Sequence, residues 1–311
     1  MSNAIETKGV RYRTGKSFAL TDLSITVPAG AIYGFLGPNG AGKTTTIRLL
    51  LGLLRPAAGE ITALGEPIPR RVRHALARIG YVPERPHLHM SLTVEETIRF
   101  HSAFYPTWDS RWAGDLLACF GLDRSRGIRS LSKGELGKVM ITLALAQKPE
   151  LLVLDEPTDG LDPVVRRELL SALLDYVSER AATVFISSHL VHELERVCDW
   201  VGVLDRGHLI SEMPMQMFKN GIKRIAVTNP PERHVDAPFT VIARERREGG
   251  GETWSVRGWD PEMAGYFSRN GGMVREVIDL DLEEAFVELL RTSRRGGVRA
   301  PATAPSQAIA V

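Results

Sequence analysis

The chain has 311 residues, with 39 Lys and Arg against 37 Asp and Glu, so its formal net charge is +2. Apolar residues at 43% and charged residues at 24% are typical of a soluble globular protein, and the length predicts about two domains. This balance gives no electrostatic reason to expect nucleic acid as a partner, and no apolar run approaches the ~20 residues that span a bilayer. Two cysteines are too few for a disulfide framework or a zinc site, and residues 1–6 lack a secretory pattern, so a reducing, cytosolic setting is expected.

Apolar patterning along residues 18–188 predicts strands that alternate with helices. The strands are short apolar or alternating runs, and Thr93 with Glu96 has the pattern of a helix capping box. Continuous apolar strands that alternate with helices indicate a parallel sheet covered on both faces. The predicted strands are 18–27, 31–36, 79–83, 151–154 and 183–187, and the predicted helices are 44–54, 93–104, 110–120, one that begins at Ser132, and 163–180.

The pattern changes after residue 212. Short strand candidates alternate there with Gly-rich and charged turns, and the last element is a helix near 282–290. We therefore expect a small appended α/β region at 216–293, followed by a disordered tail at 294–311, which is rich in Arg and Gly and then in Ala and Pro. The strand candidates are 225–228, 239–244 and 253–256.

Residues 37–44 match the pattern G-x-x-x-x-G-K-[ST] at every fixed position, between a predicted strand and a predicted helix. Glycines in such a loop let successive backbone N–H groups converge on phosphate oxygens, and the following helix adds the positive end of its dipole. Lys43 is expected to reach the β- and γ-phosphates of ATP, and the Thr44 hydroxyl to bind Mg²⁺. The predicted nucleotide-binding residues of this segment are Gly37, Pro38, Asn39, Gly40, Ala41, Gly42, Lys43, Thr44 and Thr45.

A pair of acids follows the apolar strand 151–154. An acid that ends a strand of a parallel sheet lies at the carboxyl edge of that sheet, which is where ligands bind in open α/β folds. Asp155 is expected to hold Mg²⁺, directly or through water, whereas Glu156 points elsewhere and can orient an attacking water. Together with the phosphate-binding loop, these acids predict a nucleotide-hydrolysing site.

Further motifs resemble those of ATP-binding cassette (ABC) proteins, and their order holds over about residues 1–215. The resemblance implies an α/β fold of the P-loop NTPase class. Its cassette would combine a mostly parallel sheet, an N-terminal antiparallel β part and a helical subdomain at about 85–130. The motifs are Leu131-Ser132-Lys133-Gly134-Glu135, which resembles the LSGGQ signature, residues 159–162, which resemble the D-loop, His189, which resembles the switch histidine, and Tyr12, placed like the aromatic residue that stacks on adenine.

The resemblance implies two cassettes that face each other, with each ATP clamped between the phosphate-binding loop of one and the signature of the other. Ser132 and the N–H of Gly134 would contact the γ-phosphate of the partner's ATP, which suits the anion preference of a helix N-terminus. Glu156 would be the general base or would orient the water, His189 would contact the γ-phosphate, and Asp162 would communicate across the dimer. The implied catalytic residues are Lys43, Glu156 and His189, and the implied Mg²⁺ ligands are Thr44, Asp155 and Glu84.

The sequence departs from the family pattern at two motifs, and in both it resembles the variant found in the cassettes of type-2 ABC exporters. The Q-loop glutamine aligns with Glu84, and Lys133 and Glu135 replace two signature residues whereas Ser132 and Gly134 are kept. In transporters, the groove beside the Q-loop receives a coupling helix of the membrane subunit. Five aromatic residues cluster in this stretch and are mostly expected to pack in a small helical core: Phe100, Phe104, Tyr105, Trp108 and Trp112.

The motifs are compatible with three functions, which different features of the sequence favour or oppose. The leading expectation is the ATP-hydrolysing subunit of an ABC exporter, peripheral to a separate permease at the cytoplasmic face of the cell membrane, working as a homodimer or heterodimer. The alternative is a soluble ABC ATPase that acts on ribosomes or DNA, which the single phosphate-binding loop, the lack of a heptad run and the near-neutral charge oppose. A non-hydrolysing nucleotide sensor is suggested by Glu84 and opposed by Lys43, Asp155, Glu156 and His189.

Overall fold

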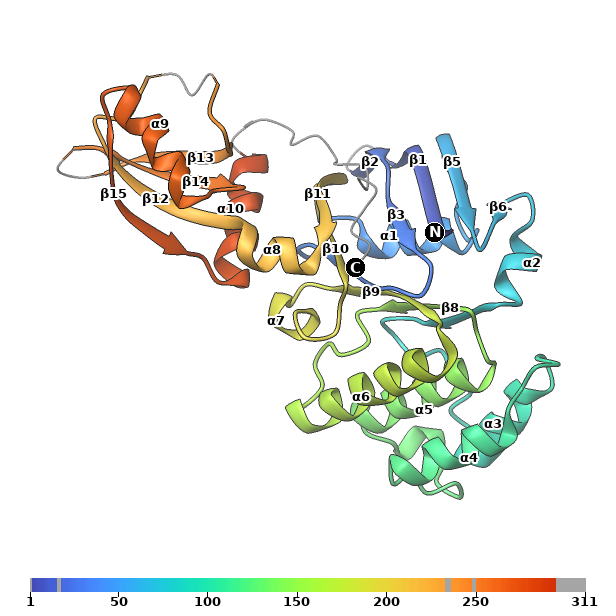
Figure 1. Ribbon diagram of the computed structural model, residues 1–311. Helices are drawn as coiled ribbons and strands as arrows, with labels where there is room; N and C mark the ends of the chain where they lie inside the picture. The colour runs from blue at the N-terminus through green and yellow to red at the C-terminus, as the bar shows by residue number, and fades with distance from the viewer. Residues whose placement is uncertain (1, 16–17, 233–235, 248–249, 295–311) are drawn as a thin grey trace.

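The computed structural model describes residues 2–15, 18–232, 236–247 and 250–294. Within these residues the strands form three sheets: an antiparallel sheet near the N-terminus, a mostly parallel central sheet and an antiparallel sheet near the C-terminus. Figure 1 shows a layer of helices on one side of the central sheet, the N-terminal sheet on the other side, and the C-terminal sheet projecting from one end of the molecule.

The central sheet is built from β4 (Ile32–Leu36), β7 (Ile79–Val82), β8 (Leu151–Asp155), β9 (Thr183–Ser188), β10 (Trp200–Asp205) and β11 (His208–Pro214). Its strand order is β11-β10-β4-β9-β8-β7, with β11 antiparallel to β10 and the other neighbours parallel. The predicted parallel sheet is thus confirmed, and β10 and β11 are additions to it. Because the parallel strands share one direction, the segments after β4, β9, β8 and β7 meet at one edge of the sheet.

Alternation along β8 explains why its sequence is apolar throughout. Leu152 and Leu154 belong to a buried cluster shared with the helical layer, whereas Leu151 and Val153 belong to a cluster shared with the N-terminal sheet. A strand buried on both faces needs apolar side chains at every position.

The N-terminal sheet comprises β1 (Asn3–Thr14), β2 (Phe18–Leu23), β3 (Thr26–Pro28), β5 (Ala58–Ala63) and β6 (Glu66–Ile68). Its strands run β2-β1-β5-β6, and β3 pairs with β1. The sheet confirms the N-terminal antiparallel part implied by the family resemblance. Strand β1 was not among the predicted elements.

The helices of this part are α1 (Lys43–Leu50), α2 (Val72–Leu76), α3 (Val94–Ser102), α4 (Ser110–Cys119), α5 (Lys133–Ala146), α6 (Pro163–Arg180) and α7 (Val191–Leu194), with a short 3-10 turn at Ile128–Ser130. The Thr93 and Glu96 capping box at α3 is present as predicted. The prediction that the first helix extends to residue 54 is wrong, because α1 ends at Leu50. Gly52 has a φ of +67° and follows the helix end, and the N–H of Leu53 donates to the carbonyl of Arg48 at 2.8 Å. A glycine in the left-handed region commonly terminates a helix in this way.

The C-terminal part contains α8 (Met215–Gly221), β12 (Ile222–Thr228), β13 (Thr240–Arg246), β14 (Glu252–Arg257), a 3-10 turn (Pro261–Met263), α9 (Ala264–Arg269), β15 (Met273–Asp279) and α10 (Leu282–Arg294). Its sheet has the order β13-β14-β12-β15 and a core of its own, in which Trp254 and Phe267 pack edge to face. Helix α10 packs both on β13 of this sheet and on α7, β10 and β11 of the central part. Arg294, predicted to start the tail, ends α10, and residues 295–311 lie outside the described part of the chain.

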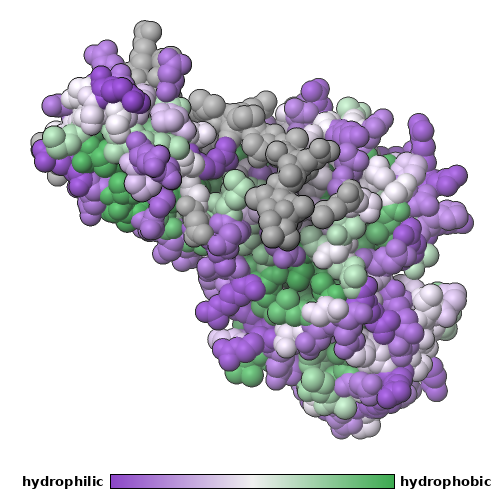
Figure 2. All heavy atoms as spheres, viewed as in Figure 1, coloured by the Kyte–Doolittle hydropathy of each residue, from purple (hydrophilic) through white to green (hydrophobic). Residues whose placement is uncertain are grey.

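Strand β15 is an edge strand whose side chains are mostly exposed. Its exposed apolar residues include Met273, Val277 and Ile278, and Figure 2 shows apolar surface over this end of the molecule. Arg275 and Glu276 interrupt the apolar residues. Charged side chains of this kind protect an exposed edge from pairing with other strands.

A buried carboxyl group links the N-terminal and central sheets. The Tyr33 hydroxyl donates to Oε1 of Glu212 at 2.7 Å, and the N–H of Thr26 donates to the same atom at 2.9 Å. Burial raises the pKa of Glu212 above its ordinary value of 4.5, although these two donors act in the opposite direction. Burial and the neighbouring Glu212 also raise the pKa of the Tyr33 hydroxyl.

The raised pKa of Glu212 makes stability depend on pH. The folded protein holds this proton to a higher pH than the unfolded chain, so the stability contributed by Glu212 is lost as the pH rises from 4.5 through the folded pKa. A Glu212→Gln variant offers an acceptor to both donors and does not titrate. We expect the free energy of unfolding of the variant, relative to the unmodified chain, to increase over this window and then level off in urea titrations. Parallel pH profiles for the two proteins would contradict the prediction.

Candidate functional site

The loop between β4 and α1 is shaped by close backbone contacts. A Cβ atom on Gly37 would lie 2.4 Å from the backbone oxygen of Leu204, which forbids any other residue there. Gly42 has a φ of +118°, and a Cβ atom on it would lie 2.8 Å from Leu20. The two fixed glycines of the phosphate-binding pattern are therefore required by the packing of this loop.

A cavity of about 350 Å³ opens at the carboxyl edge of the central sheet. The segments that follow β4, β7, β8 and β9 all contribute to its wall, as the topology requires. The structure thus brings together the loop, the acidic motif, the Q-loop position and the switch histidine predicted from the sequence. The lining residues are Phe18, Asn39, Gly40, Gly42, Lys43, Thr44, Thr45, Glu84, Glu156, Asp159 and His189.

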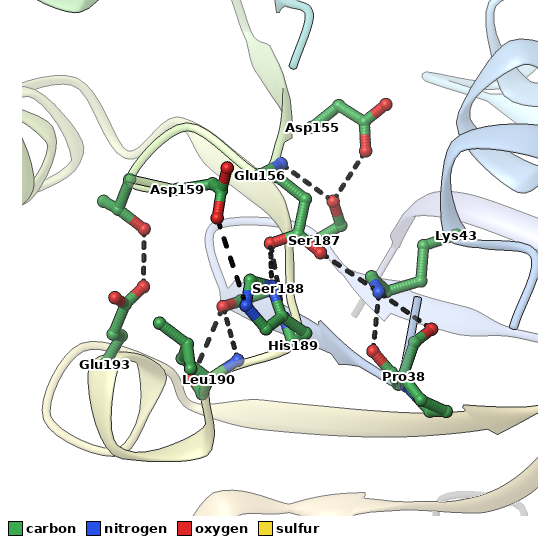
Figure 3. Close-up of polar contacts among 12 residues, drawn as sticks. Pro38, Lys43, Asp155, Glu156, Asp159, Ser187, Ser188, His189, Leu190 and Glu193 are labelled. Atoms are coloured by element: carbon green, nitrogen blue, oxygen red, sulfur yellow. Dashed lines mark hydrogen bonds and ion pairs between the residues drawn. The ribbon is translucent and has the colours of Figure 1, made fainter. Parts of the chain in front are cut away.

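Lys43 is held inside its own loop (Figure 3). Its Nζ donates to the carbonyl oxygens of Gly37 at 2.5 Å and Pro38 at 3.2 Å, and forms an ion pair of 3.0 Å with Oε1 of Glu156. The Lys43 side chain is 5% exposed and that of Glu156 is 10% exposed. The cation expected to bind phosphate therefore has a buried carboxylate as its partner in the nucleotide-free chain.

Glu156 also contacts the switch histidine. Its Oε2 lies 2.9 Å from Nδ1 of His189 and accepts the backbone N–H of the same residue at 3.3 Å. Nε2 of His189 lies 4.0 Å from Oδ1 of Asp159. Glu156 has a φ of +49°, an unusual conformation for a residue with a side chain. Strain of this kind persists where the surroundings impose it, and it clusters at active sites.

The Asp155 side chain points away from that of Glu156 (Figure 3), and Ser187 links the two residues, because its Oγ accepts the backbone N–H of Glu156 at 3.0 Å. The Ser187 hydroxyl donates to Oδ1 of Asp155 at 2.8 Å, and the Thr44 hydroxyl also donates to this carboxylate. Burial raises the pKa of Asp155, and the negative charges of Glu156 and Glu84 add to this effect. These groups are therefore close enough to repel one another electrostatically.

The signature residues lie outside this cavity. Ser132 caps α5: its Oγ accepts the N–H of Glu135 at 3.2 Å, and Glu135 Oε2 accepts the N–H of Ser132 at 2.8 Å. Glu135 also forms an ion pair with Arg126. Sequence reasoning treated Glu135 only as a departure from the signature, although Ser132 and Glu135 have the spacing of a capping box.

The D-loop acid is likewise engaged within its own chain. Oδ1 of Asp162 accepts the N–H groups of Val164 at 3.0 Å and Val165 at 3.1 Å, so this side chain caps α6. Asp162, Ser132 and Gly134 are not among the residues that line the cavity. Their predicted contacts with ATP therefore depend on a second cassette.

Phe18 is a cavity residue that sequence reasoning did not select. The predicted aromatic, Tyr12, stands opposite Leu20 in the hairpin and its hydroxyl contacts Oγ1 of Thr14 at 3.2 Å. Phe18 stands opposite Thr14 at the start of β2, and its ring lies beside Gly42 of the phosphate-binding loop. The assignment of Tyr12 to adenine stacking stays a prediction.

Comparison with known proteins identifies the family. The family model described as ABC transporter matches residues 20–159. The bacitracin transport ATP-binding protein BcrA of Bacillus licheniformis is 38% identical over 300 residues, which cover 93% of this chain and 98% of that relative. The chain belongs to the ABC transporter family. This ABC chain is also 35% identical to the Nod factor export ATP-binding protein I of Burkholderia lata over 268 residues, 83% of this chain and 87% of the relative.

Solved structures agree with this assignment. An ATP-binding subunit of an ABC transporter superposes with a TM-score of 0.63 and 30% identity over 69% of this chain and 91% of that structure. A dimeric ATP-binding cassette with ADP and Pi, 22% identical, shares the fold with a TM-score of 0.60 over 68% of this chain and 98% of that structure. The predicted cassette fold is confirmed, and as a member of this family the chain is an ATPase. The alternative on ribosomes or DNA and the non-hydrolysing sensor are not favoured.

Proposed function

We propose that the chain is the ATP-hydrolysing subunit of an ABC exporter and energises a separate membrane permease from the cytoplasmic face of the cell membrane. The observation that carries the proposal is the cavity in which Lys43, Glu156 and His189 meet beside the phosphate-binding loop. The relatives named for bacitracin transport and Nod factor export support the direction of transport. No helix among the described residues has the length and apolar character needed to cross a membrane.

The geometry suggests how ATP would act on this site. Loop N–H groups and the start of α1 bind the phosphates, and Lys43 exchanges its ion pair with Glu156 for phosphate oxygens. Glu156 is then free to orient and deprotonate a water for in-line attack, with His189 beside it. ATP binding thus releases the carboxylate that hydrolysis needs. Tyr12 is proposed to stack on the adenine.

The donor set suits Mg²⁺. The cavity wall has Lys43 against the carboxylates of Glu84, Glu156 and Asp159, with Asp155 behind, so a triphosphate needs an additional cation. Within the described residues no group of three or more His, Cys, Asp or Glu side chains forms a metal site. Mg²⁺ is commonly held by one or two carboxylates together with substrate phosphates. Thr44, Asp155 and Glu84 would hold the ion, which neutralises phosphate charge when bound.

Two cassettes would complete each site. Ser132 is exposed at the start of α5, and Gly134 lies two residues further along, outside the chain's own cavity. We propose that they contact the γ-phosphate held by a second cassette, identical or different, and that Asp162 lies at the same interface. Residues 1–215 would form the cassette, with a helical subdomain at about 85–130, and residues 216–293 an accessory region.

The test is purification of the Glu156→Gln protein from membranes in the presence of ATP, followed by identification of the membrane protein that accompanies it. We expect one permease, recovered only with ATP-competent protein. The Lys43→Met variant is the matched control. Recovery of ribosomes or DNA at moderate salt, without a membrane protein, would contradict the proposal.

The helical subdomain offers a surface for the permease. Phe104 is 65% exposed and Phe100 is 43% exposed, and the centroids of their rings are 5.2 Å apart. Trp108 and Trp112, in contrast, pack against the core. We expect the amount of permease that co-purifies with a Phe100→Ser/Phe104→Ser variant to fall at least about ten-fold, because the apolar contact area is removed. ATPase activity without permease should be unchanged. The control is Met217→Ser, which changes an apolar residue of α8 that is 61% exposed. Full permease recovery would contradict the prediction.

A further inference from the structure

Helix α7 carries a carboxylate that the proposed reaction does not use. The side chain of Glu193 is 1% exposed. Its Oε2 accepts the hydroxyl of Thr158 at 2.5 Å, and its Oε1 forms an ion pair of 2.8 Å with Nη1 of Arg166 (Figure 3 shows the first contact). A buried carboxylate with a hydroxyl donor and a guanidinium has strong, directed partners.

The two partners of Glu193 lie at opposite ends of the D-loop. Thr158 immediately precedes Asp159, the first residue of that loop. Arg166, on α6, donates from Nη2 to the carbonyl of Leu161 at 3.2 Å near the other end of the loop. One side chain, Glu193, therefore holds both ends of residues 159–162.

The same helix is joined directly to the switch histidine. His189 and Leu190 are the only residues between β9 and α7, and the N–H of Leu190 donates to the Ser188 hydroxyl at 3.0 Å. The position of α7 therefore affects His189 through a two-residue link and the D-loop through Glu193. The Asp159 side chain also reaches from the D-loop toward His189.

The C-terminal part of the chain packs on this junction. Val191 and Leu194 of α7 belong to the same buried cluster as Phe286 and Leu289 of α10. Since α10 follows the third sheet in the chain and packs on α7, movement of the accessory region would be transmitted to α7.

We infer that Glu193 is a positioning residue for ATP hydrolysis, which fixes the D-loop relative to the switch histidine. It touches no cavity-lining group except through Thr158, Arg166 and the chain itself. The inference rests on the proposed pairing of two cassettes, because the D-loop acts at their interface. A shift of this loop by a fraction of an ångström would lower the rate without weakening ATP binding.

The test compares Glu193→Ala, Glu193→Gln and Thr158→Val in the full chain. We expect Glu193→Ala to lower kcat about 10- to 100-fold with the KM for ATP within about two-fold of the unmodified value. Glu193→Gln keeps one acceptor oxygen for Arg166, and its amide N–H can donate to the Thr158 hydroxyl, so it should recover most of kcat. Thr158→Val removes only the donor and should lower kcat in the same direction, and the Thr158→Val/Glu193→Ala double variant should be no slower than Glu193→Ala.

The matched control is Glu195→Ala. Glu195 lies one residue beyond α7, is 39% exposed and pairs with Lys219 at 3.5 Å, so its removal should leave kcat unchanged. An unchanged kcat in both Glu193→Ala and Thr158→Val would overturn the inference. A parallel loss of ATP affinity and kcat, with no recovery in Glu193→Gln, would overturn it in favour of a purely structural role. If Glu193→Ala does not fold, Thr158→Val carries the same comparison.

A second readout separates this inference from the proposed function. In the Glu156→Gln background, ATP should drive dimerisation, and adding Glu193→Ala should weaken the dimer about ten-fold with ATP binding retained. If the Glu156→Gln chain forms no ATP-dependent dimer, the proposed pairing of cassettes fails. If it dimerises and Glu193→Ala has no effect on dimerisation or kcat, only the role of Glu193 is rejected.

Discussion

Replacing Glu156 with Gln is expected to lower the rate of ATP hydrolysis about 10³-fold, because the variant loses the base that activates water. The same change removes the anion that pairs with Lys43 at 3.0 Å in the nucleotide-free chain. Lys43 then has no competing carboxylate, so ATP should bind more tightly than to the unmodified chain. Phosphate release under single-turnover conditions measures the first effect, and equilibrium binding of ATP measures the second.

A matched carboxylate at the other end of the same strand tests the specificity of this result. Glu150 immediately precedes β8, is 57% exposed and pairs with Arg78 at 2.6 Å. Glu150→Gln should hydrolyse ATP at the unmodified rate, since surface ion pairs contribute little. Hydrolysis by Glu156→Gln at the unmodified rate would show that another group activates water. Weaker ATP binding by that variant would contradict the proposed competition for Lys43.

The sequence predicted those elements whose side chains are buried in a regular pattern. Helix α6 has the predicted bounds. Strands β8 and β9 extend the predicted strands by one residue each, because their apolar runs leave few alternatives. Strand β1 was missed because register shifts at Val10/Tyr12 and Lys8/Arg11 break its alternation. Strand β15 was missed because most of its side chains are exposed, which removes the periodic signal.

The site was predicted in its parts and not in its contacts. Each motif has a local pattern, so Lys43, Glu156 and His189 could be selected without a structure. Their mutual arrangement depends on the order of the strands and on the rotamers of side chains such as Lys43 and Glu156, which are over 100 residues apart in the sequence. No local pattern encodes such an arrangement. The Glu193 contacts with Thr158 and Arg166 were missed for the same reason: they join three separate elements at a packed junction.

The Lys43–Glu156 ion pair gives Lys43 two roles that can be separated. In the nucleotide-free chain Lys43 neutralises a carboxylate that is only 10% exposed. Removing one partner of a buried ion pair leaves an uncompensated charge and costs about 3 kcal/mol. In the ATP-bound chain the same ammonium would neutralise phosphate oxygens, and its loss from such a contact is worth a comparable free energy.

A Lys43→Met variant should therefore lose about 3 kcal/mol of unfolding free energy without nucleotide and bind ATP at least about 100-fold more weakly. The Lys43→Met/Glu156→Gln double variant removes the unpaired carboxylate. We expect it to regain most of the lost stability in urea titrations, because no buried charge remains unpaired, while ATP affinity stays low. Equal stability of the single and double variants would show that the ion pair is not the source of the loss. ATP binding by Lys43→Met near the unmodified affinity would remove Lys43 from the phosphate site.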